Sequence, residues 1–519
     1  MESLHNTEWD VLIAGTGLPQ SLLALALSRS GKRVLHVDKN DYYGGPQAVL
    51  STQEAEAWVM NTNAGTSLFS DAALSIPTPN PSHGSPKLSF PRAYSLALAP
   101  QLIYTQSGLL SYLLSSKVYR QLEFLAMGSW WIYSPQALNL EAPSGSPPSP
   151  GQLIRIPATR EDVAFSDTGI DLRSKRAVMK VLRFVMDYEN QAEVWQPYSS
   201  KPLSDLLTHC LKLPSSLHSL FLALTLTLDK PQRTTTSYAL PRIARHLRSM
   251  GRLGAGFSAV IPKWGGMSEL TQVACRAGAV GGGVYVLGKG ITTLSTEAES
   301  TSVLLGNHDT IRTKWIVGAP DDLGPCTGCP VSSSVAAEIT SRSIAIVSSS
   351  LESLFPTTFE GSPKPAGAVV VFPVGSLGQS QHLQDNPVYL LVHSSDTGEC
   401  PVGQSIIYGF CCGESQGLLE SAIATLLTAV NEPSTPHILW SLQFKQHHPT
   451  DSNQATSQNF AEATQVLSFP PPSSDLVFDD SILDSVKSVW ERITESDADR
   501  GDFLVFGERG ALGEEYDEA

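Results

Sequence analysis

A strand, a glycine-rich turn, a helix and a second strand pattern follow one another within the first 38 residues, and this order constrains the fold most. Trp9–Ala14 (WDVLIA) is a short apolar run typical of a buried strand, and the turn Gly15–Gly17 follows it directly. Leu18–Ser30 is rich in helix formers, and Pro19 lies in the first turn, where its missing N–H costs little. Lys32–Asp38 (KRVLHVD) is a second strand pattern that ends in an acid. The segment therefore predicts a β-α-β unit of the dinucleotide-binding type.

The turn departs from the phosphate-binding form G-x-G-x-x-G at its third glycine. Gly15 and Gly17 occupy the first two positions, but Gln20 stands at the third, where a glycine normally lets helix and strand pack closely. Pro19 also crowds the turn where a pyrophosphate would approach the backbone. Asp38 is in position to hold a ribose hydroxyl. We expect a fold retained without its cofactor, and functional dinucleotide binding is the alternative.

The length of 519 residues exceeds what one hydrophobic core usually organises, so we expect more than one domain. Apolar residues recur at helical spacing in Lys175–Tyr188, and helical patterns continue as far as Met250. The predicted parts are domain I, first part, in 1–155; an inserted helical domain II in 156–252; domain I, second part, in 253–470; and a Pro-rich segment, helix and acidic tail in 471–519. Two stretches rich in Ser, Pro and Gly, at 65–91 and 134–152, are predicted to be disordered insertions.

Strand and helix patterns alternate again after residue 253. The predicted strands are Val284–Leu287, Ser343–Val347, Ala368–Phe372, Val388–His393, Ser405–Gly409 and Ile438–Phe444. The predicted helices are Met267–Ala277, Leu419–Val430 and Asp480–Arg492. The predicted fold class is therefore α/β, a multi-sheet domain of the FAD/NAD(P)-binding-like type with an inserted all-helical domain.

The charge balance limits the kinds of partner. Lys+Arg 35 against Asp+Glu 50 gives a formal net charge of −15, which disfavours nucleic acid and anionic membrane surfaces and favours a basic partner. Seven cysteines in a chain of this length do not form a disulfide scaffold. The first residues lack a basic segment followed by an apolar one, and no stretch reaches 18 consecutive apolar residues. We expect a soluble, cytoplasmic protein.

No pattern in the chain indicates a catalytic residue or a metal site. Cys326 and Cys329 form a lone CxxC, and His308 is the only further ligand nearby, so we interpret the motif as an incidental loop. The neighbouring Cys411 and Cys412 lie beside a strand pattern and are interpreted as buried thiols. The sequence contains no P-loop, no Ser-His-Asp motif and no convincing carboxylate pair. We therefore expect no catalytic residue, no cofactor and no metal.

Several blocks of the sequence resemble the Rab escort proteins and Rab GDP-dissociation inhibitors. The opening DVLIAGTGLPQ, followed by GKRVLHVDKNDYYGG at Gly31–Gly45, is similar to the first block that these proteins share. Leu102–Phe124 resembles the second block, and Gly251–Leu287, with PKWGGMSELTQ and GGGVYVL, resembles the third. In that family the glycine-rich turn is likewise degenerate and the flavin-type domain holds no flavin, which agrees with Gln20. The matching blocks are spread over most of residues 9–445.

The resemblance implies a non-catalytic protein of the GDP-dissociation-inhibitor type. The stretches SKRAVMKVLRFVMDYE, ILWSLQF and FPPPSSD look more like escort proteins than dissociation inhibitors. An escort protein binds a newly made, GDP-bound Rab GTPase, presents it to the Rab geranylgeranyltransferase alpha/beta heterodimer and carries the lipidated product to a membrane. The alternatives are a dissociation inhibitor that recycles prenylated Rab and, second, a flavin-dependent oxidoreductase, which the turn at Gln20 disfavours.

A soluble carrier of a prenyl group needs an apolar site. Moving each CH₂ out of apolar surroundings costs about 0.8 kcal/mol, so a twenty-carbon chain represents on the order of 10 kcal/mol. By resemblance the site is placed in the helical domain, which has spare aliphatic stripes. We name as lipid residues Val178, Leu182, Val185, Met186, Leu220 and Leu224. The alternative is that these side chains simply pack the helical core.

The resemblance also places a Rab-binding surface on the α/β domain. Its residues come from DKNDYYGG, SELTQ, ACRAG and GGVYVL, and we name as platform residues Lys39, Tyr42, Tyr43, Glu269, Arg276, Val284 and Val286. Tyr and Arg are favoured interface anchors, and Glu269 with Arg276 can fix register by charge-assisted bonds. The family places a Thr and a Met where this chain has Val284 and Val286, so these two positions depart from its pattern. The alternatives are a structural turn at Tyr42–Gly45 and an ordinary helix-surface pair at Glu269 and Arg276.

Two further contacts are implied in the same way. The transferase is expected to dock near the last helix of the helical domain and the turn after it, Arg245 to Phe257. The net charge of −15 and the acidic tail suit the often basic C-terminal tails of Rab proteins, and a merely solubilising tail is the alternative.

Overall fold

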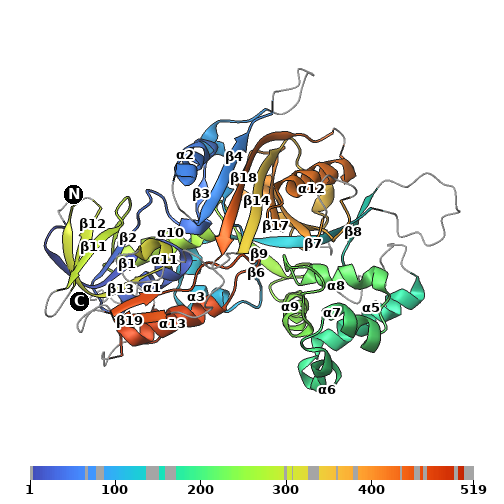
Figure 1. Cartoon of the computed structure of the whole chain (residues 1–519), viewed down its shortest axis with the longest axis horizontal. Helices are drawn as coiled ribbons and strands as arrows, with labels where there is room; N and C mark the ends of the chain where they lie inside the picture. The colour runs from blue at the N-terminus through green and yellow to red at the C-terminus, as the bar shows by residue number, and fades with distance from the viewer. Residues whose placement is uncertain are drawn as a thin grey trace, which may run out of the picture.

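Two large β-sheets, a two-stranded sheet and a group of helices make up the described part of the protein (Figure 1). The computed structural model describes residues 4–64, 68–77, 87–135, 151–157, 171–296, 301–306, 308–324, 338–357, 361–377, 384–432, 435–448, 456–459, 465–495 and 501–507. The two sheets lie side by side in Figure 1, and the helices α5 to α9 lie below the larger sheet. The α/β fold class predicted above is confirmed by this architecture.

The first sheet has a parallel centre. Its neighbouring strands are, in order, β10 (Val284–Val286), β2 (Val34–Val37), β1 (Thr7–Ala14) and β13 (Thr310–Gly318). Beyond β13 lie β12 (Thr301–Leu305) and β11 (Ile291–Thr296), while β20 (Gln465–Ser468), paired with β19 (Thr456–Asn459), lies along the other half of β13. Ala14 is in register with both Val37 and Gly318, so the segments after these three residues meet at one edge. The β-α-β prediction is confirmed.

Three helices cover one face of this sheet. The helix α1 (Leu18–Arg29) packs against α10 (Met267–Val280) and α13 (Ser481–Ile493). Ten of the twelve residues of α1 are buried, because leucine and alanine side chains surround its whole circumference. Trp490 Nε1 of α13 donates to Ser30 Oγ at 3.1 Å, which joins residues 460 positions apart in the sequence. The helix α13, near the end of the described residues, therefore helps to cover this face of the first sheet.

The second sheet has ten strands. In order they are β4 (Phe69–Ser75), β18 (Ile438–His448), β14 (Glu338–Val347), β17 (Ser405–Cys412), β16 (Val388–Ser394), β15 (Gly367–Phe372), β7 (Phe124–Ser134), β9 (Ala259–Pro262) and β6 (Ile103–Tyr104), and β8 (Gln152–Arg155) pairs with β7. The helix α12 (Gln416–Ala429) packs on one face. The strands β3 (Val49–Leu50) and β5 (Leu96–Ala97) pair in a separate two-stranded sheet, and two further helices are α2 (Thr52–Ala64) and α3 (Gly108–Ser115).

One of the two predicted disordered insertions contains a strand. Within 65–91, Phe69–Ser75 forms β4, which pairs antiparallel with β18, so the prediction of disorder is wrong there. Phe69 packs edge-on against Trp58 and Phe444, and this burial stabilises a segment whose own composition does not favour a strand. In the other stretch, 134–152, residues 136–150 lie outside the described residues.

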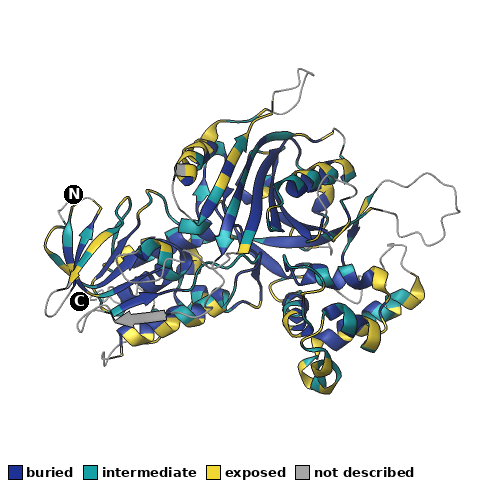
Figure 2. Ribbon diagram, in the orientation of Figure 1, coloured by how far each residue is buried: buried dark blue, intermediate teal, exposed yellow. Residues whose placement is uncertain are grey.

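The helical part follows β8. It consists of α5 (Leu172–Met186), α6 (Ala192–Trp195), α7 (Leu203–Asp205), a π-helical stretch at Leu206–Cys210, α8 (His218–Leu224) and α9 (Thr236–Ser249). These helices lie inside the range 156–252 in which a helical domain is predicted, although the domain boundaries stay a prediction. Their buried residues join those of the sheet in one hydrophobic cluster, which includes Val181 of α5, Trp130 of β7 and Tyr389 of β16. Figure 2 shows the buried side of these helices turned toward one another and toward the sheet.

The last helix of this part is also tied to the C-terminal region. Arg242 and Arg245 of α9 pair with Asp475 at 2.5 Å and Asp480 at 2.6 Å. Between these two acids, the backbone of Leu476 and Phe478 forms hydrogen bonds with Leu102 at 2.8 Å. The segment that leads into α13 therefore connects both sheets with α9.

Candidate functional site

The glycine-rich turn links β1 to α1 at the edge where the parallel strands end. Gly15 has a φ of 85°, a conformation that side chains other than glycine rarely adopt. Its carbonyl oxygen accepts a hydrogen bond of 2.6 Å from Nε2 of the buried His36. Burial lowers the pKa of His36 to about 4, so this imidazole stays neutral at physiological pH. The hydrogen bond from the neutral His36 of β2 therefore fixes the carbonyl group of Gly15 in the turn.

The Asp38 carboxylate, the candidate ribose ligand in the alternative of dinucleotide binding, forms hydrogen bonds with Thr16 and Asn40. Its Oδ2 accepts from Thr16 N at 2.7 Å and Thr16 Oγ1 at 2.6 Å, and its Oδ1 accepts from Asn40 N at 2.8 Å. The residue is 1% exposed. Burial raises the pKa of Asp38, while the hydrogen bonds from Thr16 and Asn40 lower it. The alternative of dinucleotide binding would need Asp38 to hold a ribose hydroxyl, but both of its oxygens already accept hydrogen bonds from Thr16 and Asn40.

A second carboxylate covers the glycine-rich turn. Asp322 belongs to the short helix α11 (Pro320–Leu323), which follows β13 at the same edge as the turn. A β-carbon built on Gly15 would lie 2.0 Å from Asp322 Oδ2, so the carboxylate rests on the turn itself. Gln20 Nε2 donates to Asp322 Oδ2 at 3.2 Å, and Lys39 Nζ lies 4.0 Å from its Oδ1. Gln20, which replaces the third glycine, therefore anchors an acid in the space above the turn.

This arrangement does not fit a dinucleotide. A pyrophosphate would meet the negative charge of Asp322 at the point where it must approach the backbone of Gly15. Burial raises the pKa of Asp322 well above its usual range, the nearby Asp38 carboxylate raises it further, and Lys39 opposes this effect. The side chains of Asp38, Asp322 and Gln20 are thus already arranged as a closed set of protein contacts.

Three of the platform residues, Lys39, Tyr42 and Tyr43, come from the turn after β2. Lys39 Nζ binds Asp321 Oδ2 at 2.5 Å. Tyr42 is half-buried against the core, and burial raises its pKa to about 12. The carbonyl of Tyr43 faces Ser268 Oγ of α10 at 3.5 Å. Lys39 and Tyr42 therefore contribute to local structure, and Tyr43 is the one that reaches α10.

The platform residues of α10 form a pair. Arg276 Nη2 lies 3.3 Å from Glu269 Oε1, with side chains that are 61% and 21% exposed. Val284 and Val286 lie on β10, the edge strand of the sheet, where both are half-buried against the cluster that contains Leu35. The structure therefore places Tyr43 next to Ser268 at the start of α10 and pairs Glu269 with Arg276 on the same helix.

The predicted lipid residues are mostly interior. Val178, Leu182, Val185, Leu220 and Leu224 are between 1% and 6% exposed and belong to the cluster shared by the helices and the sheet. Met186, at the end of α5, is 44% exposed. In this conformation the five buried side chains pack the core, and Leu220 alone among them also borders a cavity.

The segment predicted to dock the transferase is only partly accessible. Arg245 is bound to Asp480, and His246 and Phe257 are buried. The turn between α9 and β9 is exposed, and Leu253 is its most prominent apolar side chain, 59% exposed. Any contact made by Arg245 to Phe257 would therefore be made by the turn rather than by the helix.

Other predicted features are resolved in part. Cys326 and Cys329 lie outside the described residues. Cys411 is buried, and burial raises its pKa to about 12, whereas Cys412 is only half-buried. Within the described ranges no three His, Cys, Asp or Glu side chains are grouped so that they could hold a metal ion. In the same ranges, no helix has the length and apolar character needed to span a bilayer.

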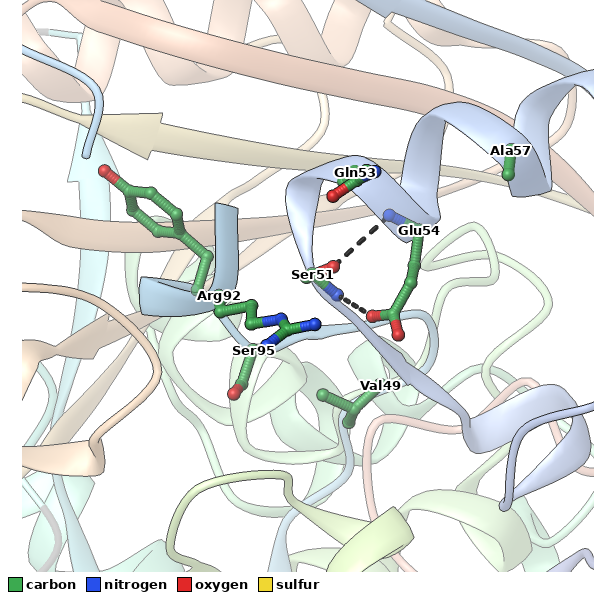
Figure 3. A pocket seen from close by; sticks show the side chains of 8 residues that line it. Val49, Ser51, Gln53, Glu54, Ala57, Arg92 and Ser95 are labelled. Atoms are coloured by element: carbon green, nitrogen blue, oxygen red, sulfur yellow. Dashed lines mark hydrogen bonds between the residues drawn. The ribbon is translucent and has the colours of Figure 1, made fainter. Parts of the chain in front are cut away.

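Sequence reasoning missed Asp321 and Asp322, as well as a pocket at the start of α2. The two acids come directly after a parallel strand next to β1, and this topology would have pointed to them had β13 been recognised. The pocket has a volume of about 580 Å³ and lies at the start of α2, where Ser51 and Glu54 cap the helix through bonds of 2.7 and 3.2 Å (Figure 3). Val49, on its wall, lies next to Gly265, which precedes α10.

Comparison with known proteins identifies the family. A family model described as GDP dissociation inhibitor matches residues 5–352. The chain belongs to the GDP dissociation inhibitor family. The part of the chain that matches the GDP dissociation inhibitor model includes the turn at Gly15, Asp322, α10 and β10.

Several curated relatives of this GDP dissociation inhibitor family member have informative names. Rab proteins geranylgeranyltransferase component A of Saccharomyces cerevisiae is 34% identical over 322 residues, which cover 60% of this chain and 49% of the yeast protein. Rab escort protein 1 of Arabidopsis thaliana is 25% identical over 569 residues, covering 95% of this chain and 94% of that protein. The chain spans about half the length of the yeast relative and 64% of the Candida albicans one.

Solved structures show the same fold. The Rab GDI of Plasmodium falciparum has a TM-score of 0.61 at 18% identity, covering 94% of this chain and 98% of its own. An oxidoreductase of Methanosarcina mazei has a TM-score of 0.55 at 12% identity, covering 93% and 100%. The predicted GDP-dissociation-inhibitor type of α/β fold is therefore confirmed.

Proposed function

We propose that this protein of the GDP dissociation inhibitor family is a Rab escort protein. It binds newly made, GDP-bound Rab GTPases, presents them to Rab geranylgeranyltransferase and delivers the prenylated product to membranes. In this role it acts in the cytosol as a non-catalytic accessory component. The observation that carries the proposal is the likeness to a protein named Rab escort protein 1 over 95% of this chain and 94% of that protein.

The geometry of the glycine-rich turn supports a binding protein rather than a flavin enzyme. Asp322 lies against Gly15, and both oxygens of Asp38 accept hydrogen bonds from Thr16 and Asn40. The turn is therefore stabilised by the protein's own side chains. The same contacts fix the segment from Asp38 to Gly44, because Gly44 N donates to Thr16 Oγ1 at 3.0 Å. A rigid segment next to α10 suits a preorganised protein interface.

The surface proposed for the GTPase is centred on Tyr43, Glu269 and Arg276. The Glu269–Arg276 pair holds the Arg276 guanidinium in one orientation on the exposed side of α10. A pre-oriented guanidinium loses less side-chain entropy when it binds a partner carboxylate or carbonyl. Lys39 supports this surface through its ion pair with Asp321, and Tyr42 supports it by packing against the hydrophobic core.

A Rab GDP-dissociation inhibitor is the second candidate. The Arabidopsis relative named guanosine nucleotide diphosphate dissociation inhibitor is 27% identical over 291 residues, covering 54% of this chain and 56% of that protein. This lower coverage favours the escort function. The two functions differ in whether unprenylated Rab is bound and handed to the transferase.

The deciding experiment combines the purified chain with Rab geranylgeranyltransferase, an unprenylated GDP-bound Rab and geranylgeranyl diphosphate. Lipid transfer that requires the chain is the expected result. Absence of transfer, together with extraction of prenylated Rab from membranes, would instead establish a dissociation inhibitor. Neither activity, together with a flavin absorbance spectrum of the purified chain, would overturn both functions in favour of an oxidoreductase.

A further inference from the structure

The helix α5 carries a basic face on a protein that is acidic as a whole. Its 15 residues include five basic side chains and no acidic one, whereas the full chain has Lys+Arg 35 against Asp+Glu 50. Four of the five are exposed, and their spacing of three, four and three residues places them along one face of the helix: Arg173, Arg176, Lys180 and Arg183. The helix lies at the outer edge of the helical part in Figure 1, away from the first sheet.

The basic face of α5 is not neutralised by the protein. Within the described residues, none of its four side chains forms an ion pair. On the neighbouring α9, by contrast, each of three arginines is paired with an acid of another segment: Arg242 with Asp475, Arg245 with Asp480, and Arg248 with Glu189. The chain therefore supplies acids to the arginines of one helix and leaves those of the next one unpaired.

This arrangement does not stabilise α5 itself. Like charges three or four residues apart destabilise a helix, and the basic face contains three such pairs. The first turn contains Arg173 and no acid, although the helix dipole favours acids at that end. The Asp171 carboxylate caps the helix by accepting from the backbone N–H of Arg173 and Ser174 at 3.2 and 3.3 Å. A face that weakens its own helix indicates contact with a partner of negative charge.

A line of apolar side chains borders the basic face. Leu172, Met179 and Met186 follow one another at intervals of seven residues, so they lie along one edge of α5. Leu172 is 74% exposed and Met186 is 44% exposed, while Met179 is half-buried against the core. Basic side chains beside exposed apolar ones are typical of a helix that lies in the headgroup region of a membrane, whereas a charged protein surface would not need the apolar line.

We propose that α5 is the surface through which this protein contacts an anionic membrane. The proposal deepens the escort function given above and rests on it, because delivery of a prenylated product requires such a contact. The basic face binds the phosphate and carboxylate groups of anionic lipids, and the apolar line enters between the headgroups. The net charge of −15 repels the rest of the molecule from the same surface, so the contact is confined to α5 and the protein is oriented by it.

The test measures sedimentation of the full chain with vesicles, made of phosphatidylcholine alone or of equal parts phosphatidylcholine and phosphatidylserine. We expect binding to the second kind, and its loss as the salt concentration rises. Each basic residue near an anionic surface strengthens binding about fivefold. The double variant Arg176→Gln with Lys180→Gln should therefore bind these vesicles more weakly by about tenfold or more.

The matched control is the double variant Arg312→Gln with Lys314→Gln. These two exposed residues are also one arginine and one lysine, and they lie on one face of β13 in the first sheet. The control changes the net charge by the same amount and should bind the vesicles as wild type does. Equal affinities of the α5 variant and this control would overturn the proposal.

A third variant tests the apolar line. Leu172→Ser with Met186→Ser removes its two exposed side chains, and we expect about threefold to tenfold weaker binding to the phosphatidylserine vesicles. The melting temperature of both α5 variants should match that of wild type, because none of the substituted side chains is buried. Wild-type affinity in the serine variant would overturn the role of the apolar line.

The failure of this proposal can be distinguished from failure of the escort function. Wild-type chain that supports lipid transfer but shows no preference for phosphatidylserine would overturn the membrane surface and leave the escort function standing. Loss of lipid transfer in the Arg176→Gln, Lys180→Gln variant with wild-type vesicle binding would assign the basic face to an acidic protein partner and overturn the proposal. Wild-type chain that binds the vesicles through α5 yet supports no transfer would confirm the surface and contradict the escort function.

Discussion

The carboxylate of Asp322 rests on the backbone of Gly15. A β-carbon at position 15 would lie 2.0 Å from Asp322 Oδ2, and the φ of Gly15 is 85°. Asp322 is also bonded to Gln20, which lies 302 positions away in the sequence. The turn and α11 are therefore complementary in shape and hydrogen bonding, although in a nucleotide-binding relative of this fold the same space would belong to a phosphate.

Gly15→Ala should destabilise the fold in two separable ways. The left-handed backbone costs a residue other than glycine about 1–2 kcal/mol, and the clash with Asp322 adds to this. Asp322→Ala in the same chain should recover only the part due to the clash. Urea unfolding of the two single variants and the double variant measures this coupling. Strict additivity of the two substitutions would mean that Asp322 does not occupy the turn.

Asp322→Asn should raise the melting temperature at pH 7. Burial raises the pKa of Asp322 in the folded state above its ordinary value of 3.8, so its contribution is most favourable below pH 3.8 and is lost as the pH rises through the folded pKa. At pH 7 the wild type therefore carries a cost that asparagine lacks. The gain should shrink toward pH 4. Asp321→Asn, at a more exposed acid paired with Lys39, is the control and should show no such gain.

The buried His246 should make stability fall with acidity. Its ring packs edge-on against Trp130 at 4.5 Å, and burial lowers its pKa from 6.5 to about 3. The unfolded chain takes up a proton near pH 6.5 and the folded chain does not, so stability is lost below that pH, by roughly 2 kcal/mol between pH 7 and 5. His246→Phe should reduce the dependence of unfolding free energy on pH by the share of one histidine, and the buried His36 should still contribute its own share.

Arg276→Ala should weaken binding of a GDP-bound Rab by about tenfold, which corresponds to about 1.4 kcal/mol. The melting temperature should hardly change, because an exposed ion pair such as Glu269–Arg276 contributes at most about 1 kcal/mol. Lys364→Ala, which removes a comparable exposed pair with Glu352, is the control for loss of one surface charge. Titration calorimetry would contradict the proposed surface if both variants bound Rab as wild type does.

Local patterns in the sequence were sufficient to predict the β-α-β unit. The apolar run before Gly15, the helix formers after Gly17 and the acid at Asp38 each act over a few residues, so their structure follows from the sequence nearby. The contacts of Asp38 could not be predicted in this way. They depend on the turn at Thr16, which lies beside Asp38 because β1 pairs with β2, whereas α11 reaches the turn because β13 pairs with β1.

The remaining differences between prediction and structure concern where helices end and which of their side chains are buried. The sequence predicts helical patterns as far as Met250, but α8 ends at Leu224 and Leu226 has a φ of 52°. The apolar spacing of α5 and α8 is the same whether a stripe meets a lipid or the helical core. Only the tertiary structure shows that Leu224 is buried while Met186 is exposed. The positions of the platform residues on α10 and β10 came from the family resemblance, and their role in binding stays a prediction.

The packing of α13 against α1 has a consequence for biosynthesis. The ribosome completes α1 early, yet the partner of Ser30, Trp490, emerges 460 residues later. At roughly 5–20 residues per second, this delay is roughly 25 to 90 seconds. During that time the leucine and alanine side chains of α1 that face α13 in the folded protein are not yet buried. The nascent chain therefore cannot finish its N-terminal core while it is being translated, and truncation before α13 should leave an aggregation-prone product rather than a smaller folded protein.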